Sequence, residues 1–149
     1  MLKEGAPDLP VFTTSIQIPD LAKMQLEVIS SEYIDVRVES VIPSRGNITR
    51  DININLVPFK KGLTYDKNSF YPDNIAFLRN PYIIRTKRGQ TVVFQPFQYN
   101  PIDGILRVHT NITISVKADG ISTDNPLVRL PLKNSCLLYT SDAADERNS

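Results

Sequence analysis

Apolar and polar residues alternate along several segments of this chain with the two-residue period of a β-strand. The clearest segment follows Gly104. One parity contains the positions expected to face a core: Leu106, Val108, Thr110, Ile112, Ile114 and Val116. The other parity contains the positions expected to face water: Arg107, His109, Asn111, Thr113 and Ser115. Because successive side chains of a strand point to opposite faces, this segment is predicted to be a half-buried antiparallel strand.

A turn and a second strand precede this segment. Residues 100–104 read Asn-Pro-Ile-Asp-Gly, a run of residues that favour turns, and residues 90–99 have the composition of a strand. Two strands joined by such a turn predict a β-hairpin.

Shorter strands are predicted elsewhere. They lie at residues 16–18, 24–28, 34–38, 52–56 and 82–85, and residues 74–79 are predicted to form one helical turn. Turn residues after Pro43 predict a loop over residues 43–51, held between two strands. Many short strands, 11 prolines and little helical periodicity predict an all-β fold, an antiparallel β-sandwich of jelly-roll type.

The chain is predicted to contain one folded domain. Its 149 residues can bury a core without disulfides or a structural metal. The alternating pattern predicts a β domain over residues 5–117, a linker over 118–134 and a disordered tail over 135–149. Residues 136–146 resemble a translated sequencing-adapter read-through, and a genuine acidic, mobile terminus is the alternative.

The charge balance argues against two classes of partner. Lys and Arg number 17 and Asp and Glu number 16, so the net charge is +1. No strong field therefore points to nucleic acid or to an anionic membrane surface. No apolar run is long enough to cross a membrane, and residues 1–5 lack the apolar core of a secretory signal, so the chain as written is expected to be neither inserted nor exported.

The residues that carry catalysis or bind metals are sparse. His109 and Cys136 are the one histidine and the one cysteine, and they lie in unrelated settings, so no nucleophile and base, metal site or cofactor site is predicted. His109 is expected on the polar, solvated face of its strand. The basic cluster of Arg85, Lys87 and Arg88 is expected at an exposed hairpin tip, with contact to an acidic partner as the alternative.

The predicted loop carries one candidate binding residue. Gly46 and Asn47 favour an exposed turn, and flanking strands would hold Arg50 in an extended, fixed presentation. A pre-ordered extended segment with a long cation suits insertion into a protease cleft, because the ordering entropy is lost before binding. From the residues alone, an ordinary solvated surface arginine is the favoured interpretation.

Several motifs resemble one known family. They are Gly5-Ala6-Pro7-Asp8-Leu9-Pro10, Glu27-Val28-Ile29-Ser30-Ser31, Pro43-Ser44-Arg45-Gly46, Phe70-Tyr71-Pro72, Asn80-Pro81-Tyr82-Ile83-Ile84-Arg85, Arg88-Gly89-Gln90 and Phe97-Gln98-Tyr99-Asn100-Pro101. In order and spacing they resemble the propeptide domain of the gingipain cysteine peptidases, over roughly residues 5–116. Residues 51–56 depart from the family pattern.

The resemblance implies a function. The family's propeptide is a non-catalytic β-sandwich that precedes a caspase-like peptidase domain, assists its folding and keeps it latent. A basic residue on its inhibitory loop fills the specificity pocket of the peptidase. Matched by position, that role falls on Arg50, with Asn47, Ile48, Thr49 and Asp51 beside it, and the implied partner is an arginine-specific cysteine peptidase. The full-length parent is expected to be secreted, at the cell surface or in the periplasm.

Two departures and one alternative accompany this interpretation. The family domain normally begins well before Gly5 with further strands, and no peptidase domain follows, so the chain is expected to be a truncated reading frame whose sandwich lacks N-terminal strands. The alternative function is a β-sandwich adhesion or carbohydrate-binding module. Such modules present exposed rows of aromatic residues, whereas this chain has no tryptophan.

Overall fold

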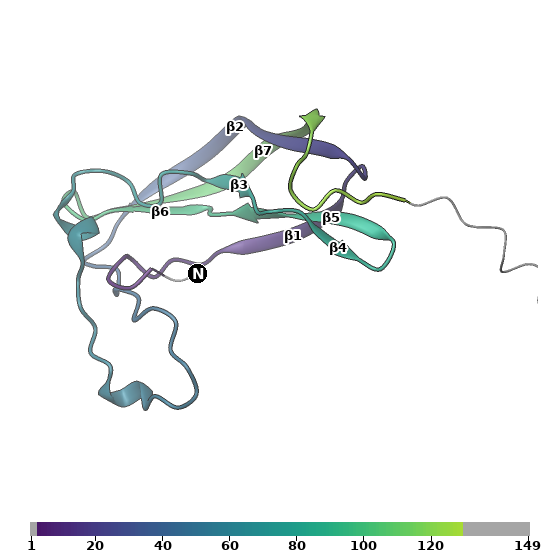
Figure 1. Ribbon diagram of the computed structural model, residues 1–149. Coiled ribbons are helices and arrows are strands. Elements are labelled where there is room, and N and C mark those ends of the chain that lie inside the picture. Colours follow the sequence, from purple (N-terminus) through teal and green to yellow (C-terminus); the bar gives the residue numbers. More distant parts are fainter. Residues whose placement is uncertain (1–2, 130–149) are drawn as a thin grey trace, which may run out of the picture.

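The structure, a computed structural model, describes residues 3–129, and its regular secondary structure consists of β-strands and two short 3-10 turns (Figure 1). The strands are β1 (Phe12–Gln17), β2 (Ala22–Arg37), β3 (Ala76–Leu78), β4 (Tyr82–Ile84), β5 (Lys87–Phe94), β6 (Phe97–Asn100) and β7 (Ile105–Ile121). Two short 3-10 turns are present, η1 (Ile54–Leu56) and η2 (Leu63–Asp66).

The strands form two antiparallel sheets. In one sheet β5 pairs with β1, β3 and β4, and in the other β7 lies between β2 and β6. Figure 1 shows β2 and β7 as a long ribbon that lies above the sheet built on β5. The predicted all-β, antiparallel, sandwich-like fold is therefore confirmed.

The predicted hairpin joins β6 to β7. The side chain of Asn100 organises its turn, because its Oδ1 accepts hydrogen bonds from the backbone N–H groups of Ile102 (3.1 Å) and Asp103 (3.3 Å). The Asn100 amide group also donates to the Asp103 carboxylate at 2.9 Å. An asparagine that bonds to the backbone two and three residues later is the local reason for a turn at this place.

Three predicted elements differ from the structure. The separate strands at 24–28 and 34–38 are one strand, β2, whose pairing with β7 is interrupted by bulges. The predicted strand at 90–99 is split, since β5 belongs to one sheet and β6 to the other. The helical turn predicted at 74–79 is wrong, because the segment pairs with β5 as the extended strand β3.

The strand predicted at 52–56 is also wrong. This segment has no partner strand among the described residues, and it forms the 3-10 turn η1. The side chain of Asn53 accepts a hydrogen bond from the N–H of Asn55 at 3.1 Å, which caps that turn. An alternating pattern without a neighbouring strand does not fix an extended backbone.

Arg88 lies in the interior rather than at a hairpin tip, so the prediction of an exposed cluster is wrong at this residue. Its side chain is 1% exposed. The guanidinium donates to the backbone carbonyls of Pro19 (3.0 Å), Ala22 (2.6 Å), Asp124 (2.9 Å) and Asn125 (2.7 Å). Arg88 therefore fastens the segment after β7 to the turn between β1 and β2.

This attachment extends the folded region beyond residue 117. Strand β7 continues to Ile121, and two backbone hydrogen bonds follow it, from Ser122 N–H to Leu21 O (2.8 Å) and from Leu127 N–H to Asp20 O (2.9 Å). Residues 118–127 of the predicted linker thus pack with the sheets. The predicted tail, with Cys136, lies outside the described residues.

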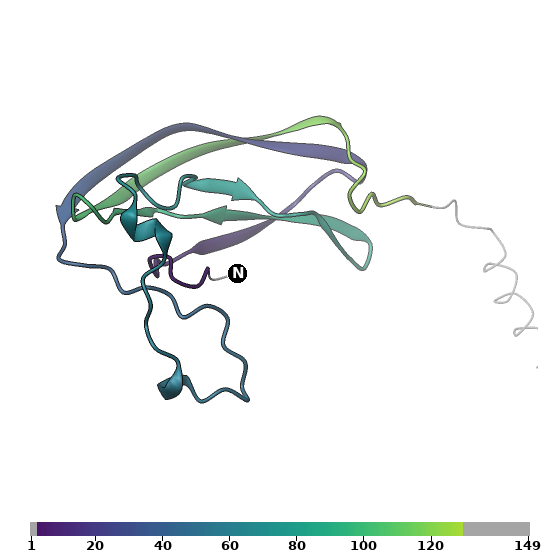
Figure 2. The same ribbon diagram turned by 60° about the vertical axis from the view of Figure 1, so that its left-hand side comes forward.

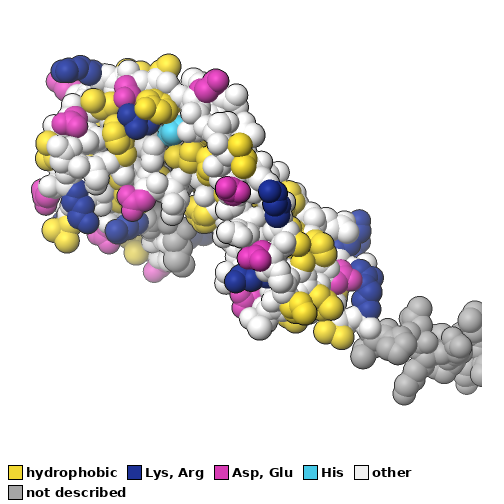
Figure 3. Space-filling view, turned by 90° about the horizontal axis from the view of Figure 1, so that it is seen from above, with side chains coloured by type: hydrophobic (Ala, Val, Ile, Leu, Met, Phe, Trp, Pro, Cys, Tyr) yellow, Lys and Arg dark blue, Asp and Glu magenta, His cyan; other side chains and the backbone are white. Residues whose placement is uncertain are grey.

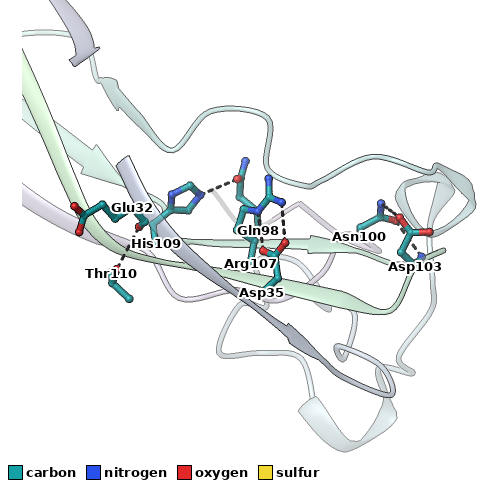
Figure 4. A network of polar contacts seen from close by, with 8 residues as sticks. All are labelled: Glu32, Asp35, Gln98, Asn100, Asp103, Arg107, His109 and Thr110. Carbon is teal, nitrogen blue, oxygen red and sulfur yellow. Dashed lines mark hydrogen bonds and ion pairs between the residues drawn. The ribbon is translucent and has the colours of Figure 1, made fainter. Parts of the chain in front are cut away.

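His109 is buried rather than solvated, and this prediction too is wrong. Its exposed fraction is 9%, and its Nε2 lies 2.8 Å from Oε1 of Gln98 (Figure 4). The amide nitrogen of Gln98 donates to the carbonyl of Pro72 at 2.7 Å, so Oε1 is the acceptor and His109 carries its proton on Nε2. Nδ1 is buried and has no hydrogen-bond partner among residues 3–129.

The chain from Phe70 to Pro72 lies against the face of β7 that carries Arg107 and His109. The Arg107 guanidinium lies between the Tyr33 ring (3.9 Å) and the Phe70 ring (4.1 Å) while it pairs with Asp35 at 2.8 and 2.9 Å. The burial expected from the alternation of β7 is therefore wrong in this part of the strand. Val108 is only half-buried and Thr110 is exposed, whereas His109, which was expected in water, is buried where the chain that leads to Pro72 lies against it. On the face shown in Figure 3, acidic and basic side chains are interspersed.

We expect stability to fall with acid because of His109. Burial lowers the pKa of His109 below its usual 6.5, the nearby Arg107 lowers it further, and Asp35 opposes them. Below pH 6.5 the unfolded chain binds a proton that the folded chain resists, so the free energy of unfolding decreases. Urea unfolding at about pH 7.5 and about pH 5.5 measures this decrease, and His109→Gln should reduce it. Equal pH dependence in both proteins would exclude His109 as its source.

Candidate functional site

A long loop, residues 45–61, projects away from the sheets (Figures 1 and 2). Its two ends are held together by the N-terminal segment. Ser44 exchanges hydrogen bonds with Gly5 and Ala6, from Gly5 N–H to Ser44 O (2.9 Å) and from Ser44 N–H to Ala6 O (2.7 Å). At the other end, the N–H of Gly62 donates to Gly5 O at 2.8 Å. We call residues 45–61 the projecting loop and Gly5, Ala6, Ser44 and Gly62 its neck.

The neck depends on glycine because two backbones meet there. A Cβ on Gly5 would lie 3.0 Å from the Gly62 nitrogen, and a Cβ on Gly62 would lie 3.1 Å from the Gly5 oxygen. Gly5 also has a φ of 76°, a left-handed conformation that glycine adopts without strain. The two glycines thus allow the close approach that closes the loop at its base.

Arg45 ties the interior of the projecting loop together. Its Nη1 donates to the carbonyl of Ile54 at 2.8 Å and lies 3.4 Å from the carbonyl of Val57. Its guanidinium carbon lies 4.2 Å from the centre of the Phe59 ring. The outgoing and returning arms of the loop are therefore connected by one side chain.

Arg50 lies at the corner of a turn on the same loop. The N–H of Ile52 donates to the carbonyl of Thr49 at 3.2 Å, and Arg50 and Asp51 are the exposed residues between them. Hydrogen bonding with the Thr49 side chain lowers the pKa of the Asp51 carboxyl. Within residues 3–129, Arg50 forms no hydrogen bond or ion pair through its side chain. Its guanidinium is thus available to a partner.

The five residues predicted for the site form one continuous strip on the projecting loop. Asn47, Thr49, Arg50 and Asp51 are exposed, and Ile48 is half-buried. Ile48 lines a groove of about 500 Å³ together with Ile54 and Phe59. The structure places the strip on a protrusion, the location that insertion into another protein requires.

Apolar residues beside Arg50 were not predicted as part of the site. Ile52, Ile54, Leu56 and Phe59 are all exposed on the projecting loop. Ile52, Ile54 and Leu56 alternate with polar residues as they would in a strand. An apolar stripe that has no partner strand among the described residues is the sequence signal that could have identified an exposed contact surface. Arg45 was also missed, because its contacts join residues nine to fourteen positions apart in a loop without regular structure.

The described part of the chain carries no metal-binding constellation. No group of three or more His, Cys, Asp or Glu side chains is arranged to hold a metal ion within residues 3–129. Those same residues include no helix that is long and apolar enough to span a bilayer.

A family model and curated relatives match the chain over most of its length. The model Propeptide_C25 matches residues 1–127. Gingipain R1 of Porphyromonas gingivalis is 40% identical over 114 residues, which cover 76% of this chain and 12% of the relative. Gingipain R2 of the same organism is 35% identical over 125 residues, which cover 84% of this chain and 17% of the relative. The chain thus spans less than a fifth of these relatives.

Two solved structures are similar to the chain. One is a complex of the pro- and mature domains of Porphyromonas gingivalis RgpB, with a TM-score of 0.79, 33% identity, and coverage of 93% of this chain and 71% of that chain. The other concerns the zymogenic latency of gingipain K from the same organism. Its TM-score is 0.69 over 80% of this chain and 69% of that chain, and at 21% identity it supports the fold alone.

Proposed function

This chain belongs to the Propeptide_C25 family of gingipain propeptides, and we propose that it assists the folding of an arginine-specific cysteine peptidase and keeps that enzyme latent. It is a non-catalytic prodomain, and its contribution to latency is steric and electrostatic rather than chemical. The alternative of an adhesion or carbohydrate-binding module gains no support from the relatives, which are peptidases and their prodomains.

One observation carries the proposal: Arg50 is exposed at the corner of a turn on a loop that is closed at its neck and tied within. Such a loop loses little conformational freedom when it binds, so more of the contact energy remains as affinity. The guanidinium matches a carboxylate with two parallel hydrogen bonds, and exclusion of water strengthens this pair. An arginine-specific pocket with an acid at its base is the partner of that chemistry.

The projecting loop is compatible with two modes of inhibition. The bond between Arg50 and Asp51 is either held away from the attacking thiolate, or it is cut and both new ends are retained. The neck and the Arg45 contacts lie on both sides of that bond, so neither mode requires the loop to separate from the domain.

The proposal predicts competitive, arginine-selective inhibition. The purified chain is titrated into a gingipain-type peptidase that cleaves after Arg, with a small Arg substrate, and into one that cleaves after Lys. We expect the apparent KM for the Arg substrate to rise with chain concentration while kcat is unchanged, and inhibition of the Lys-cleaving enzyme to be weaker. Equal inhibition of both enzymes, or inhibition of neither, would contradict the proposal.

A further inference from the structure

The projecting loop carries two arginines with different surroundings. Arg50 extends from a turn and has no side-chain partner within residues 3–129. Arg45 is half-buried, donates to the carbonyls of Ile54 and Val57 and stacks on Phe59. Both are long cations in one loop, yet only Arg50 can leave the loop surface without loss of hydrogen bonds.

The contacts of Arg45 span the bond that an arginine-specific enzyme would attack. Arg45 lies on the N-terminal side of the bond between Arg50 and Asp51, and Ile54, Val57 and Phe59 lie on its C-terminal side. The neck repeats this arrangement at the base, because Ser44 and Gly62 are both bonded to Gly5. The Arg50 turn is thus enclosed by two successive cross-connections.

We propose that Arg45 is a positioning residue, which holds the two arms of the projecting loop so that Arg50 keeps its inhibitory presentation whether the loop is intact or cut. This inference rests on the proposed function. The physical basis is a charge-assisted hydrogen bond to a carbonyl together with a cation–π contact, both internal to the loop and independent of the partner. The loop is ordered before binding, and its cut ends stay in place.

Replacement of Arg45 should weaken inhibition without unfolding the domain. In Arg45→Met the aliphatic part of the side chain remains while its donors are lost, and we expect the inhibition constant to rise about tenfold, with partial restoration in Arg45→Lys. Phe59→Leu removes only the aromatic contact and should have a smaller effect in the same direction. Arg85→Met, at the exposed turn between β4 and β5, is the matched control and should change nothing.

A second measurement separates positioning from direct contact with the peptidase. Trypsin, which also cleaves after Arg, is added to the isolated chain, and cleavage between Arg50 and Asp51 is followed by mass spectrometry. We expect faster cleavage in Arg45→Met, with an unchanged urea midpoint for the domain. The nicked wild-type chain should retain most of its inhibition, whereas nicked Arg45→Met should lose it.

The outcomes distinguish the inference from the proposed function. If Arg45→Met weakens inhibition but leaves the trypsin rate unchanged, Arg45 contacts the peptidase and the positioning role is overturned. If neither quantity changes, the role is overturned as well. If Arg45→Met accelerates trypsin while replacement of Arg50 leaves inhibition intact, the internal tie stands and the pocket-filling function of Arg50 fails.

Discussion

Replacement of Arg50 by alanine is expected to raise the inhibition constant against an arginine-specific cysteine peptidase about 30- to 1,000-fold. The reason is the loss of a charge-assisted contact inside a water-excluded pocket, which costs on the order of 2–4 kcal/mol. The free chain should barely respond, because Arg50 is exposed and surface substitutions change stability by less than about 0.5 kcal/mol. Steady-state inhibition by both proteins, with urea unfolding of each, measures the two effects.

Two further variants make the Arg50 result specific. Arg50→Lys keeps the positive charge but not the planar pair of donors, so its inhibition constant should lie between those of the wild type and Arg50→Ala. Arg85→Ala removes another exposed arginine from a different turn and should inhibit as the wild type does. Comparable losses in Arg50→Ala and Arg85→Ala would mean that net charge, rather than a pocket, governs the interaction.

Replacement of Arg88 by methionine is expected to have the largest effect on folding, about 3–5 kcal/mol of destabilisation. Four backbone carbonyls lose their donor, and hydrogen bonds from a charged group are worth about 1.5–3 kcal/mol each, although such values do not add within one network. Methionine fills a similar volume, so the loss is mainly polar. Urea unfolding monitored by circular dichroism gives the free energy.

The neighbours of Arg88 provide its control. Lys87 is exposed on the same strand, and Lys87→Met should change the free energy of unfolding by less than about 0.5 kcal/mol. The amides of residues 122–125 should exchange faster with solvent in Arg88→Met, because the segment after β7 loses its attachment. Equal stability of the two variants would show that the four carbonyls find other donors.

The sequence predicts the sheets well where both partners of a strand pair are strongly patterned. The hairpin of β6 and β7 follows from the Asn100 turn and from the alternation after Gly104, and both features are local. At residues 52–56 the pattern is equally regular, but the strand that it predicts is wrong. Alternation indicates that one face of a segment is apolar. It does not indicate whether a neighbouring strand is present to form hydrogen bonds with the backbone.

Arg88 illustrates a second limit. Arg88, Gln90 and Val92 lie on one face of β5 and are buried, and Gly89 and Val93 on the other face are buried as well, so β5 is an interior strand. From sequence, a charged residue such as Arg88 is normally expected at the surface, because burial of an uncompensated charge is costly. The compensation comes from carbonyls near residues 19–22 and 124–125, and only the tertiary structure brings these together.

The position of the projecting loop follows from its turn residues, and the family resemblance selects Arg50 within it as a prediction. The sequence alone does not distinguish the surroundings of Arg50 from those of Arg45, since both are arginines in one irregular segment. The difference arises from contacts with Ile54 and Phe59, which depend on the path of the returning arm.

A double-mutant cycle between the two proteins tests the central claim most directly. Binding is measured by calorimetry for wild-type chain and Arg50→Ala, each with a thiol-blocked peptidase that retains or lacks the acid of its specificity pocket. We predict a coupling energy of about 2–4 kcal/mol, so that Arg50→Ala costs little once the acid is absent. A coupling energy near zero would show that Arg50 does not occupy that pocket.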